Sequence, residues 1–155
     1  MELMMNVEAA KEKIIQLHQR FEQSFPSSPE YNQTSKELDA LYYENLNIRE
    51  VVLITKNLGH KDTIDDDAKM IVAAANGENV AQVMGLSVEA QAAYKILHAR
   101  LKKGWTQTEL GEKVGLSQSQ VAKIETLQQI PDVGIFSKLL TALNTNMSFG
   151  VRRTE

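Results

Sequence analysis

Apolar side chains recur at alternating spacings of four and three residues between Leu3 and Phe21. This is the spacing of a helix that buries one stripe, so the pattern predicts an amphipathic helix. Two prolines in the segment Ser24–Pro29 end the pattern, because proline breaks helical hydrogen bonding. The same alternation then resumes, and we expect a second helix from Tyr31 to Ile54 that pairs with the first as an antiparallel hairpin.

Shorter helical segments follow the hairpin. Thr63 can cap a third helix, which Asn76-Gly77 closes with residues that tolerate a left-handed conformation. A short helix is expected from Asn79 to Met84. After the linker Gly85-Leu86-Ser87, a further helix should run to Lys103 and end at Gly104. The pattern therefore predicts an all-α chain with an N-terminal region, residues 1–86, and a second region, residues 87–155.

The segment from Gln107 to Glu125 has the pattern of two short helices around a turn. Gly111 is small where two helices must cross closely, and Gly115 supplies the positive φ of the turn. The apolar positions of both helices face one core. These positions are Leu110, Val114, Leu116, Val121 and Ile124.

The second helix of this pair has one polar face. Ser117 can cap its N-terminus, and Gln118, Ser119 and Lys123 point away from the core. Glutamine, serine and lysine side chains bond base edges and phosphates, and a helix N-terminus adds free N–H groups and a positive dipole end. The pattern favours a DNA-recognition helix.

At this point the sequence resembles the Cro/repressor-like (Xre-type) helix-turn-helix family. The matching positions are Thr106-Gln107, Glu109-Leu110, Gly115, Ser117-Gln118, Val121 and Ile124-Glu125. The resemblance covers residues 88 to about 146 and implies a five-helix, lambda-repressor-like DNA-binding domain. The chain departs from the family pattern at Trp105 and Gly111, and it lacks a glycine after the recognition helix.

The resemblance also implies roles for individual residues. Gln107 would hold a DNA phosphate, and Arg100 would pair with Glu125 as a structural bridge. The implied DNA-binding set is Gln107, Ser117, Gln118, Ser119, Gln120 and Lys123, of which Gln118, Ser119 and Lys123 contact bases or the groove and Gln120 the backbone.

After a helix expected from Val133 to Leu143, residues 147–153 alternate between apolar and polar like a β-strand. A lone strand leaves its backbone groups unpaired, so it should add to a strand of another chain. With Met147, Phe149 and Val151 on one face, we expect this strand to form a homodimer. A short strand after an Xre-type domain also resembles the HigA-type and HipB-type antitoxins.

Charge divides the chain at the same place as the helical pattern. Residues 1–86 carry 8 Lys and Arg against 14 Asp and Glu, whereas residues 87–155 carry 9 against 6, which gives the total of −3. This asymmetry is typical of an acidic interaction region joined to a region that faces nucleic acid.

Several function classes find no support in the 155 residues. There is no cysteine, no apolar run of bilayer length and no basic segment at the start, which together favour a cytoplasmic protein. The three histidines lack the spacing of metal ligands, and Asp65-Asp66-Asp67 complements the dipole of a first helical turn. We therefore expect neither an enzyme nor a metal or cofactor site.

The sequence favours a transcriptional repressor that binds a double-stranded DNA operator. The resemblance implies the antitoxin of a type II toxin–antitoxin pair, with residues 1–86 contacting a toxin or a dimer mate. One alternative is a phage-type or stand-alone repressor without a toxin. The alternative from another class is a protein-binding adaptor, in which the acidic hairpin carries the function.

Overall fold

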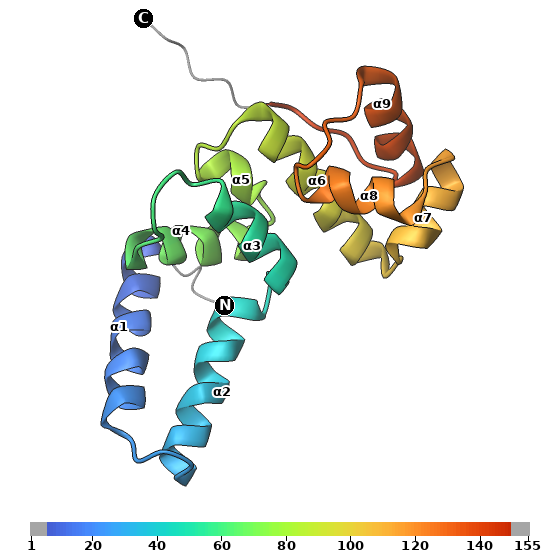
Figure 1. The fold of residues 1–155 in the computed structure, drawn as a ribbon. Helices are drawn as coiled ribbons and strands as arrows, with labels where there is room; N and C mark the ends of the chain where they lie inside the picture. The colour runs from blue at the N-terminus through green and yellow to red at the C-terminus, as the bar shows by residue number, and fades with distance from the viewer. Residues whose placement is uncertain (1–5, 150–155) are drawn as a thin grey trace, which may run out of the picture.

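The computed structural model describes residues 6–149, and over this range it consists of α-helices joined by short loops (Figure 1). In chain order the helices are α1 (Val7–Gln23), α2 (Pro29–Tyr43), α3 (Ile48–Lys56), α4 (Ile64–Ala75), α5 (Val80–Val83), α6 (Val88–Lys103), α7 (Gln107–Val114), α8 (Gln118–Glu125) and α9 (Val133–Ala142). The expected helical class is confirmed for the described residues. None of these helices is both long and apolar enough to cross a membrane.

α1 and α2 form the expected antiparallel hairpin, which projects away from the other helices (Figure 1). The rings of Phe21 and Tyr31 contact each other near its tip, with centroids 4.4 Å apart. The apolar stripe of α1 also packs on α4, where Ala10 and Ile14 are fully buried together with Ala68. The apolar stripe of α1 therefore packs against both α2 and α4, rather than against one partner helix.

The expectation of one helix from Tyr31 to Ile54 is wrong, because residues 44–47 separate α2 from α3. The side chain of Asn47 accepts a hydrogen bond of 2.9 Å from the backbone N–H of Arg49 and so starts a new helix. The change of direction allows Leu53 and Ile54 to be buried in the core that includes α6.

α6 is the central helix of the fold, since it contributes to two cores. Tyr94 and Leu97 pack with residues of α3, α4 and α5. Ile96 lies on the other side and packs with buried residues of α7, α8 and α9. Leu86, in the expected linker, is itself buried in the first core. The two sequence regions therefore meet through extensive apolar contact rather than through an exposed hinge.

Two expectations for the C-terminal part need correction. The segment 88–146 has four helices, α6 to α9, rather than five. The expected strand is not present in its described part, residues 147–149, because every described neighbour is helical and offers no strand edge for pairing. Val151 and the rest of that segment lie outside the described residues. Phe149 packs instead on Phe136, with ring centroids 6.1 Å apart.

One polar contact ties α2 to α4. The Tyr42 hydroxyl donates a 3.0 Å hydrogen bond to Oδ2 of Asp67. Burial raises the pKa of Asp67 from its usual 3.8 to about 6, and nearby Asp62 adds to the rise. The folded state therefore binds a proton more tightly than the unfolded chain does. The stability that this protonation contributes is present below pH 4 and is lost as the pH rises through 6.

Replacing Asp67 by asparagine should remove this pH dependence, because an amide keeps an oxygen acceptor for Tyr42 and carries no charge. We expect Asp67→Asn to be more stable than the wild type at pH 7.5 by roughly 1 kcal/mol, after a discount for the half-exposed carboxyl. The difference should vanish near pH 4. Urea unfolding at the two pH values measures it, and equal stability at pH 7.5 would contradict the raised pKa.

Candidate nucleic-acid interface

Local capping signals define the two helices of the motif. The Thr106 hydroxyl accepts a hydrogen bond from the backbone N–H of Glu109 and begins α7. Gly115 ends α7 in the left-handed region, at φ 74°. At the start of α8, Ser117 and Gln120 cap each other reciprocally, through hydrogen bonds of 2.8 and 3.1 Å. The turn between the helices therefore follows from residues within it.

α7 and α8 cross closely at Gly111. A Cβ added at this position would overlap the backbone carbonyl oxygen of Leu116, just before α8. Beneath this crossing, Leu110, Val121 and Ile124 are almost completely buried. The packing fixes the angle and the distance between the two helices, and hence between the polar side chains at their N-termini.

A buried ion pair anchors the end of α8 to α6. Nε and Nη2 of Arg100 donate hydrogen bonds of 2.6 and 2.9 Å to the two carboxylate oxygens of Glu125. The third donor group, Nη1, binds the backbone carbonyl of Trp105 at 2.7 Å. Both side chains are at most 3% exposed. The structure thus joins the two residues that the resemblance pairs.

This pair continues outward into two glutamines. Nε2 of Gln107, at the start of α7, donates a 3.0 Å hydrogen bond to Oε1 of Glu125. Its Oε1 accepts a 2.7 Å hydrogen bond from Nε2 of Gln118, at the start of α8. Since both oxygens of Glu125 accept from Arg100, the amide of Gln107 must turn its nitrogen toward the carboxylate. A chain of hydrogen bonds therefore runs from the core to the surface.

The chain of hydrogen bonds leaves defined polar groups free at the surface. Gln107 keeps its second N–H, and Gln118 keeps one N–H and its oxygen. Ser119 and Lys123 are exposed on the same helix. In contrast, the Ser117 hydroxyl and the Gln120 oxygen are used by the cap. The six residues of the expected DNA-binding set therefore lie together, but two of them have a structural role within α8.

Two departures from the family pattern have structural explanations. Leu127 adopts a left-handed φ of 61° after α8, where the sequence lacks a glycine. Its half-buried side chain packs against the core around α6. The ammonium groups of Lys103 and Lys113 each lie over the ring of Trp105, at 5.0 and 4.5 Å from the ring centroid.

The sequence analysis missed one neighbour of this surface. A groove separates α3 from the helix-turn-helix, and Gln107, Thr126 and Gln128 line it opposite Arg49 and Lys56. The signal in the sequence is the seven-residue spacing of the two cations, which places them on one stripe of a helix. The contact between α3 and the motif spans about fifty residues, so spacing alone could not reveal it.

The arrangement has the chemistry of a nucleic-acid surface. Gln107 at the start of α7 and Gln118 at the start of α8 place two hydrogen-bonding amides next to each other, and Lys123 is exposed on α8, which matches the donor and acceptor groups of base edges and phosphates. Across residues 6–149 no three His, Asp or Glu side chains gather to hold a metal ion.

Comparison with known families matches residues 96–149 to a helix-turn-helix family. The match covers about a third of the chain and includes α7, α8 and α9. It supports the Cro/repressor-like resemblance of this segment and a DNA-binding regulator of transcription, a class of domain that is not enzymatic. No curated protein and no solved structure matches the chain.

Proposed function

We propose that this protein is a transcriptional repressor that binds an operator through α8. The observation that carries the proposal is the pair of surface glutamines held by the buried Arg100–Glu125 bridge. Side chains already fixed in the free protein lose little conformational freedom on binding. The pair lies within the segment that matches a helix-turn-helix family.

The free groups of Gln118 favour adenine at one operator position. In the major groove adenine presents an acceptor, N7, beside a donor, the N6 amino group. Gln118 retains one N–H and its oxygen, which complement these two groups. Gln107 donates its remaining N–H to a phosphate and fixes the register of α8 on the duplex.

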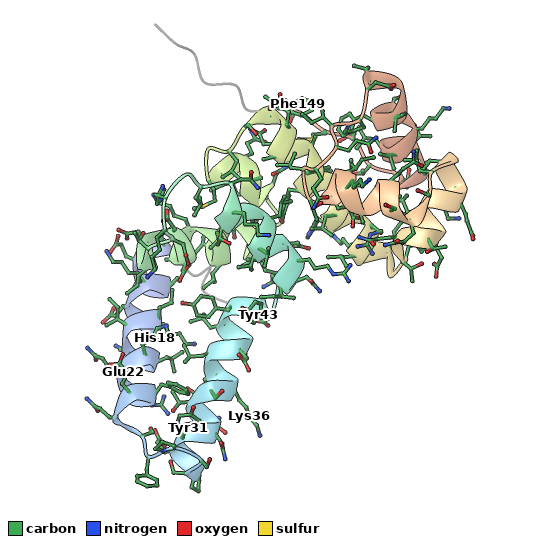
Figure 2. The ribbon with its side chains drawn as sticks, in the orientation of Figure 1. His18, Glu22, Tyr31, Lys36, Tyr43 and Phe149 are labelled. Atoms are coloured by element: carbon green, nitrogen blue, oxygen red, sulfur yellow. The ribbon has the colours of Figure 1, made fainter. Side chains whose placement is uncertain are left out.

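Residues 87–155 hold the DNA in this proposal, and residues 1–86 contact a partner. The acidic α1–α2 hairpin projects from the fold, which leaves most of its surface open (Figure 2). A second copy of the chain is one such partner, because two protomers that read two half-sites double the number of base contacts. Binding of two protomers to one operator, measured by sedimentation, tests this part.

An antitoxin role is the finer form of the proposal. The net charge of −6 over residues 1–86 favours a basic partner protein, such as a toxin. Co-expression of the chain with its neighbouring reading frame tests this role. Co-purification of a basic protein supports an antitoxin, and its absence favours a stand-alone repressor. An adaptor without DNA binding would show no operator complex at all.

The proposal predicts different effects for the two glutamines. An operator is first selected with the wild-type protein from a pool of random duplexes. Gln118→Ala should then lose about 1 to 3 kcal/mol of discrimination at one base pair, and Lys123→Ala should weaken the same operator. Gln107→Ala should weaken binding to unrelated DNA as well as to the operator, because it removes a phosphate contact. Titration at fixed salt measures all three affinities.

Glu112→Ala is the control for these variants, since Glu112 is exposed on α7 and takes part in no contact described above. It should bind as the wild type does. If Gln118→Ala and Lys123→Ala both keep wild-type affinity and base preference, α8 is not the helix that reads the operator.

A further inference from the structure

We propose that α3 is a third DNA-contacting element, in which Arg49 and Lys56 bind the sugar-phosphate backbone of the duplex that α8 reads. This inference rests on the proposed DNA binding and extends it to a helix outside the matched segment, residues 96–149. The ligand is the polyanionic backbone, so the contacts add affinity and contribute no base recognition.

α3 is held rigidly against α6. Leu53 and Ile54 are buried in the core that includes Tyr94 and Leu97 of α6. Oε1 of the buried Glu50 lies 3.2 Å from Nδ1 of His98, also on α6. Because α6 carries Arg100 as well, the same helix positions both α3 and the end of α8.

The exposed face of α3 is positively charged, whereas the N-terminal region that contains it, residues 1–86, has a negative net charge. Its only acidic residue, Glu50, is 2% exposed and faces α6, whereas Arg49 and Lys56 are exposed. Neither cation forms an ion pair within residues 6–149. The N-terminal region as a whole has a net charge of −6. Two cations without an ion pair therefore line the groove between this region and the helix-turn-helix.

The groove beside α3 is continuous with the proposed interface. Gln107, the proposed phosphate contact, lines the groove together with Arg49 and Lys56. The acidic residue of the lining, Glu125, is already bound by Arg100 and Gln107. The Thr126 hydroxyl in the lining already donates to the Ala122 carbonyl, whereas the side-chain amide of Gln128 can donate to phosphate oxygens. The free charge of the groove is therefore positive, which complements a duplex backbone next to α8.

The test compares two double variants of the full chain on one probe, a fluorescein-labelled 30-base-pair duplex of mixed sequence, across a KCl series. Loss of two phosphate contacts should reduce the slope of log K against log salt by about 1.8 and weaken binding at 0.15 M KCl by roughly 30-fold. We expect both effects for Arg49→Ala/Lys56→Ala. The exchange Arg49→Lys/Lys56→Arg keeps both charges and should keep most of the slope.

Lys13→Ala/Lys36→Ala is the matched control, because it removes the same charge from exposed positions of the α1–α2 hairpin, where Figure 2 labels Lys36. It should leave the slope nearly unchanged. Equal slopes for the two alanine double variants would overturn the role of α3. If Gln107→Ala weakens binding and Arg49→Ala/Lys56→Ala does not, only this inference fails. If the wild type itself does not bind the duplex, the proposed function fails with it.

Discussion

Glu125→Ala should lower the free energy of unfolding by about 3 to 5 kcal/mol, the usual cost of removing one partner from a buried ion pair. The substitution leaves Nε and Nη2 of Arg100 without acceptors in a site that is 3% exposed. Only the contact from Nη1 to the Trp105 carbonyl remains. A chain of this size should lose roughly 10 °C of melting temperature. Thermal unfolding followed by circular dichroism measures the change.

The control for this substitution is Glu112→Ala, which removes the same side chain from an exposed position of α7. Its effect should stay within about 0.5 kcal/mol. Arg100→Met/Glu125→Leu should recover much of the lost stability, since an apolar pair leaves no unpaired charge. Equal melting temperatures for Glu125→Ala and Glu112→Ala would show that the buried bridge does not stabilise the fold.

Glu125→Ala should also weaken DNA binding at temperatures where the variant is folded. Glu125 accepts the hydrogen bond that orients the amide of Gln107, and Gln107 in turn orients Gln118. Without this acceptor the two glutamines sample more conformations, so binding must order them again. A folded variant with unchanged operator affinity would show that the Arg100–Glu125 bridge does not orient the glutamines for DNA binding.

Gly111→Ala should destabilise the protein by about 1 to 3 kcal/mol, as expected when a group is forced into a filled contact. The added Cβ would overlap the carbonyl oxygen of Leu116, which belongs to the backbone and cannot rotate away. The N–H of Leu116 also donates a 2.9 Å hydrogen bond to the Gly111 carbonyl, so moving this residue disturbs the turn. The gain in helix propensity, about 0.5 to 1 kcal/mol, is smaller.

A shifted turn changes the distance between the N-termini of α7 and α8, so operator affinity should fall together with stability. Thr108→Ala tests helix propensity alone, because Thr108 is exposed on α7. It should keep or slightly raise the melting temperature. A Gly111→Ala protein that melts at or above the wild-type temperature, with full operator affinity, would show that the crossing has room for a methyl group.

The sequence alone determined the helix ends that depend on local signals. Ser87, Thr106 and Ser117 cap helices through their own hydroxyl groups, at the positions where the sequence predicts helix starts. Gly104 and Gly115 end helices in the left-handed region. Each of these signals acts within four residues, so no tertiary contact is needed to specify it. The helix-turn-helix could be recognised from the sequence for the same reason.

Other features were decided by contacts between distant residues. The four-three spacing continues through residues 44–47 with the polar Asn45 at one of its positions, and the chain breaks there where Asn47 caps α3 and Leu53 and Ile54 become buried near α6. The segment Gly85-Leu86-Ser87 has the composition of a linker, yet Leu86 is buried because both sides of α6 have neighbours. The alternation after Asn146 has no strand to pair with among the described residues.

The candidate site divides in the same way. Helical periodicity placed Gln118, Ser119 and Lys123 on one face of a helix, and the family resemblance added Gln107 to the same surface. Only the tertiary structure shows that Gln107 connects the buried bridge to Gln118, and that Arg49 and Lys56 line the adjoining groove. α3 reaches this groove by packing on α6, forty residues away in the chain. Burial against a shared helix, rather than any local pattern, determines where its cations lie.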